Sequence, residues 1–194
     1  MPLLIVIVIL AIIAFYVIAV YNSLQTLKTQ IVASIQEIGN QLKRQASLIP
    51  NLEAAVKGYL KHEKGIFEML TAARTSAQKA SASGESKDIE KAISNLQSVI
   101  PQIQVLVESN PELKSNESVN NFMRELGDTA DKLMYARRSL IDLSQAYNEK
   151  LVVFPSNIIA NMFGFKPEKG LDTALTGEHV SVSEAETKDV KVNL

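Results

Sequence analysis

The chain opens with a long apolar run, and amphipathic segments follow it. The run extends from Leu3 to Val20 and contains no charged residue and no Asn, Gln, Gly or Pro. At about 1.5 Å per residue, a helix of this length is roughly 27 Å long, close to the thickness of the hydrocarbon core of a bilayer. In lipid such a segment must be helical, because only a helix pairs every backbone polar group within one span. The run therefore predicts a transmembrane anchor over residues 1–21.

A cleaved signal peptide is the alternative interpretation of this run. It requires a basic segment before the run, a shorter apolar core and a cleavage site made of small residues. No basic residue precedes the run, and residues 18–22 (Ile-Ala-Val-Tyr-Asn) make a poor cleavage site, which favours an uncleaved anchor. The nearest cations, Lys28, Lys43 and Arg44, follow the run. They give a slight preference for a cytoplasmic body and leave the side of the membrane open.

Apolar residues after the anchor recur at steps of three and four, the period of an amphipathic helix. The first helix is expected to continue past the membrane surface to about Ala46, and a turn is expected at Ser47–Pro50. The second helix should begin at Pro50, which suits a first helical turn, and should end close to Gly84.

Two more long helices and a short one are expected in the second half of the chain. The third helix contains Pro101, which predicts a kink or two shorter helices, and a turn follows at Asn110–Pro111. The fourth, from about Val119 to Val153, has the heptad spacing that is typical of left-handed packing in helical bundles. The short apolar helix, Ser156–Phe163, should have Ser156 as its N-cap and Gly164 after its end.

Together these segments predict an all-α protein. It would be an antiparallel up-down four-helix bundle behind a single N-terminal transmembrane helix, which itself continues into the first helix of the bundle. The bundle and the short C-terminal apolar helix would occupy residues 22–165. Residues 166–194 are polar, with apolar residues scattered without a period, and are expected to be a disordered tail.

An up-down bundle would return its fourth helix to the end that faces the membrane. Tyr147–Asn148 should then lie level with Tyr21–Asn22, with both Tyr rings close to the lipid headgroups. The uncharged segment Leu151–Phe165 should either lie in the membrane interface as a second, shallow anchor or cap the lower end of the bundle. One mismatch is visible: the second and fourth helices would be roughly 15 Å longer than the soluble part of the first.

Composition narrows the possible functions. The formal net charge is −1, and residues 22–165 carry 16 basic and 15 acidic side chains, so no basic patch for nucleic acid is expected. The chain contains no Cys, which excludes disulfides, thiolate nucleophiles and zinc sites of the Cys type.

Several short motifs between these elements resemble the LemA family of bacterial membrane-anchored proteins. The most characteristic is the stretch from Leu42 to Leu52, Leu-Lys-Arg-Gln-Ala-Ser-Leu-Ile-Pro-Asn-Leu. Others match in order and with similar gaps over nearly all of residues 1–165. They are Tyr21-Asn22, Val56-Lys57-Gly58-Tyr59, His62-Glu63, Ala73-Arg74, Pro111 to Lys114, Tyr147-Asn148, Phe154-Pro155, Ile159-Ala160 and Gly164-Phe165. The chain departs from the family in lacking a Trp in the first helix, in Arg137-Arg138 and in Pro101.

The resemblance implies an antiparallel four-helix bundle behind one N-terminal span, no enzyme activity and no cofactor. It also implies a location at the bacterial inner membrane or at a membrane derived from it; one branch of the family is placed at the magnetosome membrane. The family-motif or interaction residues expected on this basis are Tyr21, Asn22, Lys43, Arg44, Leu48, Ile49, Pro50, Asn51, Gly58, Tyr59, His62, Glu63, Tyr147, Asn148, Phe154 and Pro155.

His62-Glu63 is the only constellation that suggests chemistry. His62 falls near the apolar stripe of the second helix, between Tyr59 and Ile66. A ferritin-like metal centre would need Glu-x-x-His on two helices and two further inward Glu residues. Residue 59 is Tyr, and the only other histidine is His179 in the tail. A hydrogen-bonded structural histidine is favoured, with a proton switch and a metal ligand as alternatives.

Two other features have competing interpretations. Lys43-Arg44 could form a docking surface for a protein or for anionic lipid, or could be cations near the C-terminal end of a helix, where the helix dipole favours them. Gly58 inside the second helix would cost about 1 kcal/mol relative to Ala. This favours close approach of a neighbouring helix there over simple tolerance of the loss.

Two function classes follow from these residues. The first is a membrane-tethered scaffold or interaction protein without chemistry of its own. Its partners would be the lipid bilayer, an unidentified membrane protein and possibly a second copy of the chain, and not nucleic acid. The second is a metal- or proton-sensing or enzymatic bundle that uses His62 and nearby carboxylates. The shortage of nucleophiles and the absence of a Gly-rich phosphate loop favour the first. A third reading, a secreted helical protein, would follow from cleavage of the apolar run.

Overall fold

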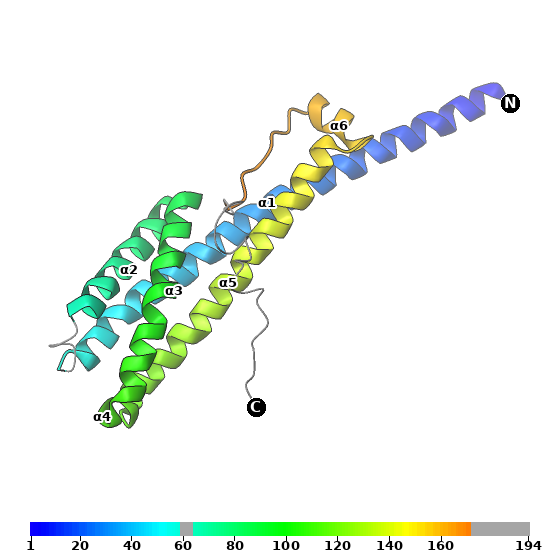
Figure 1. Cartoon of the computed structure of the whole chain (residues 1–194). Helices are drawn as coiled ribbons and strands as arrows, with labels where there is room; N and C mark the ends of the chain where they lie inside the picture. The colour runs from blue at the N-terminus through cyan, green and yellow to red at the C-terminus, as the bar shows by residue number, and fades with distance from the viewer. Residues whose placement is uncertain (59–63, 172–194) are drawn as a thin grey trace, which may run out of the picture.

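The computed structural model describes residues 1–58 and 64–171, and all regular structure within these two ranges is helical (Figure 1). This agrees with the expected all-α class. The described helices are α1 (Pro2–Val56), α2 (Lys64–Ser83), α3 (Ser86–Ser109), α4 (Pro111–Lys114), α5 (Glu117–Val152) and α6 (Ser156–Met162).

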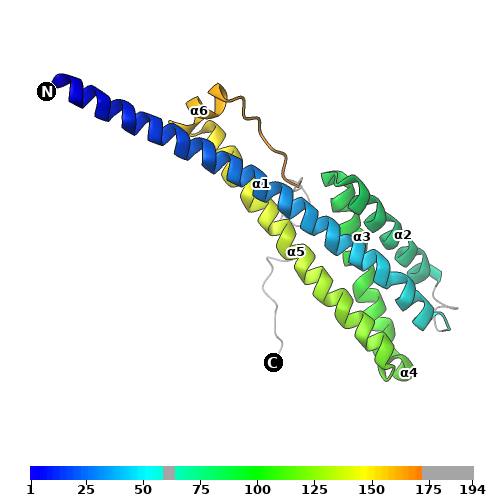
Figure 2. The same ribbon diagram turned by 180° about the vertical axis from the view of Figure 1, so that it is seen from behind.

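The helices are arranged around α1, whose N-terminal part projects alone from the rest of the molecule (Figures 1 and 2). α5 packs along α1, and α2 packs against both α1 and α3. α4 joins α3 to α5 at the end of the molecule farthest from the N-terminus, and α6 returns to α1 near the base of the projecting part. The chain thus reverses direction between successive long helices, and α1 contacts α2, α3, α5 and α6.

The expected turn at Ser47–Pro50 is wrong, because α1 continues through Pro50 to Val56. Proline removes one backbone hydrogen bond from a helix and crowds the preceding turn, at a cost of about 3 kcal/mol. Burial on both sides of Pro50 outweighs this local cost. Ile49 is 1% exposed, and Leu52 and Val56 are fully buried, so the apolar stripe of α1 continues without a shift of phase. A turn at Pro50 would have left this stripe without its partners.

The longer α1 also removes the length mismatch that the sequence suggested. The part of α1 that follows the apolar run, residues 21–56, is as long as the 36-residue α5 that packs along it. The reversal after α1 falls about ten residues later than expected, and α2 is correspondingly short, with 20 residues. A helix pair of matched length can bury one continuous seam from end to end.

The connection from α3 to α5 is fixed by two asparagine caps. α3 is a single helix with Pro101 inside it, so the alternative of two shorter helices is wrong. The side chain of Asn110 accepts hydrogen bonds from the backbone N–H groups of residues 112 and 113, which makes the expected turn the start of α4. Asn116 caps α5 in the same way. Such caps satisfy N–H groups that a helix end leaves without partners.

The core is one apolar cluster that extends from Val20 to Leu171, and it includes Leu24, Ile38, Leu70, Ile89, Ile103, Leu126, Leu140 and Tyr147. Among the described residues its buried polar members are Gln45, Ser76, Asp88, Thr129, Ser144 and Ser156. Asp88 is the ionisable one, and it joins α2 to α3: Lys79 Nζ lies 2.7 Å from its Oδ1, and Ser83 Oγ donates to its Oδ2. The hydrogen bond from Lys79 and the one from Ser83 hold the pKa of Asp88 below its ordinary value.

Replacing this carboxylate should therefore have a pH-dependent effect. Because the pKa of Asp88 is lowered in the folded chain, its contribution is present above the ordinary value of 3.8 and is lost as the pH falls through the folded value. Asp88→Asn should lower the urea midpoint of the full chain in detergent micelles at neutral pH, and the gap to the parent chain should close in acid.

Asp142→Asn is the matched control, because its partner Arg138 lies 3.9 Å away and both side chains are exposed. Exposed pairs of this kind contribute little to stability, so the control should leave the midpoint unchanged. A gap for Asp88→Asn that persists undiminished in acid would show that the ion pair is not its cause.

Candidate functional site

The structure separates the expected site residues into a group near α6 and a distal group. The group near α6 lies where the projecting part of α1 meets α5 and α6, and its expected members are Tyr21, Asn22, Tyr147, Asn148, Phe154 and Pro155. The distal group lies on the second half of α1, and Lys43, Arg44, Leu48, Ile49, Pro50 and Asn51 belong to it. Tyr59, His62 and Glu63 lie outside the described residues, so their expected roles stay predictions.

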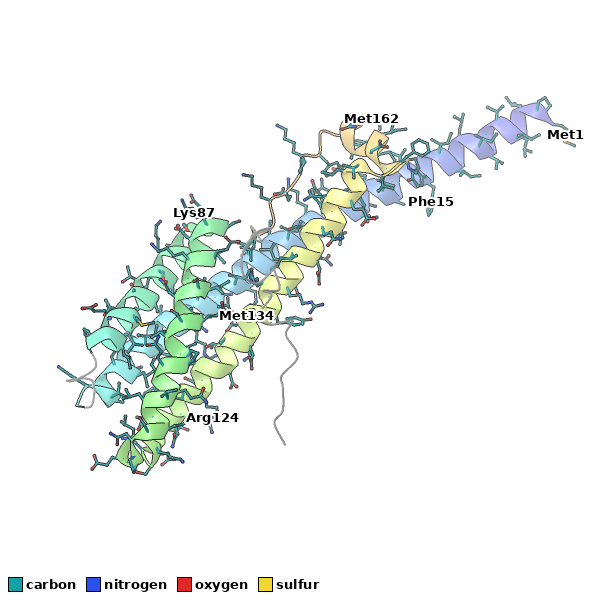
Figure 3. All side chains as sticks on the ribbon, in the orientation of Figure 1. Met1, Phe15, Lys87, Arg124, Met134 and Met162 are labelled. Atoms are coloured by element: carbon teal, nitrogen blue, oxygen red, sulfur yellow. The ribbon has the colours of Figure 1, made fainter. Side chains whose placement is uncertain are left out.

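The projecting part of α1 is apolar and exposed. Leu3 is 73% exposed, Leu10 60% and Ile18 58%, whereas Val20 is 8% exposed and Leu24 is fully buried. Figure 3 shows the side chains between Met1 and Phe15 pointing outward all around this helix. By length and composition this is a helix that could cross a membrane, and 6% of its most apolar window is buried within the molecule. The change from exposed to buried coincides with the expected end of the span at Val20.

Tyr21 links α1 to the segment that follows α6. Its ring centroid lies 4.9 Å from that of Phe163 and 5.6 Å from that of Phe165. Aromatic pairs at such separations, tilted or edge-on, add to the energy of simple burial. Its neighbour Asn22 is exposed. The sequence motif Tyr21-Asn22 therefore contains one packing residue and one residue that faces outward.

Tyr147 and Asn148 hold the chain that leaves α6. The Tyr147 hydroxyl donates to the backbone carbonyl of Lys166 over 3.1 Å, and its ring is fully buried. Asn148 Nδ2 donates to the carbonyl of Glu168 over 2.8 Å, and Asn148 Oδ1 accepts from the N–H of Glu168 over 3.0 Å. Burial raises the pKa of Tyr147. The Tyr147 ring is therefore a core residue with no exposed surface, and its expected closeness to lipid headgroups stays a prediction.

The expected disorder from residue 166 onward is also wrong for residues 166–171. Besides the contacts of Asn148, Glu168 pairs with Lys28 of α1 at 3.3 Å, Leu171 is 5% exposed, and Gly170 lies against Ser144. A Cβ at position 170 would lie 3.4 Å from the Ser144 side chain. The polar composition gave no sign of this, because backbone groups and a single ion pair make most of the contacts. The expected tail beyond residue 171 lies outside the described residues.

The turn between α5 and α6 is closed by its own hydrogen bonds. Ser156 is not the N-cap that the sequence suggested, since Pro155 holds that position. Instead the Ser156 hydroxyl lies 2.8 Å from the carbonyls of Lys150 and Val153. A hydroxyl that reaches back in this way satisfies carbonyls that the end of α5 leaves open. Phe154 and Pro155 form the exposed tip of the turn.

The distal residues lie inside α1, where several of them pack in the core or bridge to α5. Arg44 Nη2 lies 2.9 Å from Glu125 Oε1 and joins α1 to α5. Because α1 continues to Val56, Lys43 and Arg44 lie inside the helix and not at its C-terminal end, so that interpretation of the two cations is wrong. Leu48 and Ile49 are core residues, Pro50 is half-buried and Asn51 is exposed.

Gly58 also differs from its expected role. It lies in the turn after α1 and not inside a helix. A Cβ built there meets no atom within 4 Å, so the expected close approach of a neighbouring helix is wrong.

Metal-binding groups and clefts are the features of the described residues that bear on chemistry. Among residues 1–58 and 64–171, no group of three or more His, Asp or Glu side chains is placed to hold a metal ion. An open groove between α1 and α5 is lined by polar and apolar side chains together, among them Gln30, Ser34, Glu37, Tyr135 and Asp142. The most specific arrangement among the described residues is therefore the one near α6, which joins an apolar helix to a folded body.

Comparison with known protein families gives one match. The family model described as the LemA family matches residues 34–184, which is most of the chain but not the apolar run or Tyr21-Asn22. The match extends past residue 166, where the sequence resemblance ended. No curated protein matches the chain.

Replacing Asn148 tests whether its hydrogen bonds hold residues 166–171 against α5. Asn148→Ala removes two hydrogen bonds to the backbone of Glu168, each with a net contribution of about 0.5–1.5 kcal/mol. Hydrogen exchange of the amides of residues 166–171 should become about ten- to a hundredfold faster. Asn22→Ala, an exposed asparagine at the same end of the molecule, should change it little. Equal hydrogen-exchange rates in the two variants would show that the Asn148 hydrogen bonds do not hold this segment.

Proposed function

The chain belongs to the LemA family, and on this basis we propose that it is a membrane-tethered scaffold or interaction protein with no enzymatic activity. It would hold an up-down four-helix bundle against the bacterial inner membrane, or a membrane derived from it, as a single-pass protein. Its partners would be the bilayer, a membrane protein and, in a homo-oligomer, a second copy of the chain.

The observation that carries this proposal is the continuity of α1. One helix contains both the exposed apolar residues 3–18 and the buried stripe that begins at Val20. Exposed apolar side chains on all sides of a helix are stable in hydrocarbon and not in water. Since the same helix forms the central element of the folded body, the membrane and the bundle would be joined without a flexible linker.

The structure also bears on cleavage of the apolar run. A peptidase that removed it would have to cut close to Val20, where the chain is helical and Val20 and Leu24 are buried against the body. Cleavage there would cut through a helix whose Val20 and Leu24 belong to the core of the body. An uncleaved anchor is therefore the form that the packing supports.

The shape of the body supports a spacer or scaffold role. Residues 21–56 of α1 extend about 54 Å at the rise of an α-helix, so the turn into α5 at α4 would lie far from the bilayer. The outer faces of α2, α3 and α5 carry polar side chains and charged side chains of both signs, as is typical of a surface that faces water. A rod of this kind presents a partner at a fixed height and orientation.

Non-enzymatic action is the simplest account of the interior. Among the described residues the buried carboxylate is Asp88, and it is engaged by Lys79 and Ser83. Active sites usually hold several titratable groups with shifted pKa values around a cleft. The ion pair of Asp88 joins two helices instead.

Extraction of membranes at alkaline pH, together with the intact mass, tests the proposal. The protein should remain in the pellet, and its mass should include residues 1–20, because an apolar span holds by hydrophobic contact that carbonate does not disrupt. Release into the supernatant, or a mass that lacks the N-terminal segment, would contradict the tether. The purified protein should also contain no stoichiometric metal; a bound metal would favour sensing or catalysis by His62 and nearby carboxylates instead.

A further inference from the structure

We propose that the turn between α5 and α6, together with the outer face of α6, forms a second, shallow contact with the same bilayer that α1 spans. The apolar collar consists of Val152, Val153, Phe154, Ile158, Met162 and Phe163. The inference rests on the proposed membrane tether and adds to it a surface that sets how the bundle stands on the membrane.

The collar consists of exposed apolar side chains that lie close together in the sequence. Val152 is 74% exposed, Phe154 75%, Ile158 57% and Met162 64%. No charged residue occurs from Leu151 to Phe165. Contiguous apolar patches on soluble proteins mark contacts with other molecules or with membranes, whereas single apolar residues need no explanation.

The inner face of the same segment fixes its position beside the span. Ile159 is 5% exposed and Ala160 1%, and Phe163 and Phe165 pack on Tyr21. α6 contacts both α1 and α5. The segment therefore caps the body, as one of the two sequence alternatives required, and its outer face remains exposed next to the residues where α1 turns from apolar to amphipathic. Figure 3 shows Met162 on α6 and Phe15 on the adjoining stretch of α1.

Backbone polar groups of the collar are paired by hydrogen bonds within the chain, which suits an apolar environment. Segments that enter lipid must pair their polar groups internally. The Ser156 hydroxyl bonds the carbonyls of Lys150 and Val153, and the N–H of Phe163 bonds the carbonyl of Ile159. At the end of α6, Gly164 has a φ of 70°, and Phe165 N–H bonds the carbonyl of Ala160. This is the capping arrangement that closes a helix without water.

Lipid, and not a protein, is the occupant that these observations favour. The collar is continuous with the exposed apolar surface of α1, and any bilayer that takes up residues 3–18 must meet α6 at its surface. Cationic side chains flank the uncharged segment on both sides, at Lys150 and at Lys166. Lysines at the edges of an inserted segment can extend their charged ends to the headgroups. A collar of this type would sit about 5–10 Å into the boundary between headgroups and acyl chains.

Single tryptophans can measure this depth, because the chain contains no Trp. Three variants of the full chain are needed: Met162→Trp on the collar, Val105→Trp on α3 and Leu10→Trp in the span. Residues 162 and 105 are both 64% exposed, so they are matched for accessibility, and residue 10 is 60% exposed. Each variant is reconstituted into vesicles whose lipids carry bromine at a shallow or a deep acyl position, and the loss of Trp emission is recorded.

Leu10→Trp should lose emission most to the deep bromines, and Val105→Trp should lose little to either. Met162→Trp should lose emission most to the shallow bromines, at least about twofold more than Val105→Trp, as insertion at the acyl boundary requires. Ile158→Trp should repeat the result of Met162→Trp, which guards against disturbance of the fold at one position.

The outcomes separate the two proposals. If Leu10→Trp is quenched while both collar tryptophans resemble Val105→Trp, the tether stands and the collar proposal is wrong. A collar Trp whose emission shifts to the blue without quenching would show a protein contact there and would also overturn the lipid assignment. If Leu10→Trp itself escapes quenching, the membrane tether fails, and the collar proposal fails with it.

Discussion

The rest of the structure depends on one constraint, which is that a single helix contains both an exposed apolar run and the buried stripe at the centre of the body. Residues 3–18 of α1 expose apolar side chains on every side, and from Val20 onward the same helix buries a stripe that α5 and α2 cover. Because a helix is stiff over this length, the position of the apolar run fixes where the body can stand relative to a bilayer. α2, α5 and α6 all pack on α1, so their positions follow from its position as well.

Burial, and not local propensity, decides where α1 ends. Proline is unfavourable inside a helix, so the local sequence predicts a turn at Pro50. Leu52 and Val56 nevertheless continue the buried stripe. These contacts form only if the helix stays intact beyond Pro50, so tertiary packing overrides the local signal. The matched lengths of residues 21–56 and α5 are a consequence.

The segments with a periodic pattern were predictable from the sequence. The segments held by isolated hydrogen bonds or ion pairs were not. The apolar run, the heptad of α5 and the glycine after α6 each follow from a spacing or a residue type that has one structural meaning. Ser156, the Lys28–Glu168 pair and the two bonds of Asn148 join residues without any periodic pattern. Sequence reasoning therefore recovered the all-helical class and the boundary at Val20. It did not predict the contacts of residues 166–171. It also placed Gly58 inside a helix, and Lys43 and Arg44 near a helix end.

The central claim is that α1 is unbroken from the apolar run to the far end of the body, and a distance across Pro50 tests it most directly. The chain has no cysteine, so paired nitroxide labels can be introduced at Thr29 and Ala54, which are both exposed. In a continuous helix these positions are about 38 Å apart, whereas a reversal at Pro50 would bring them to about 25 Å. A single narrow distribution at the longer distance, in the full chain in vesicles, is the result that the account predicts. A distribution centred at the shorter distance would contradict it.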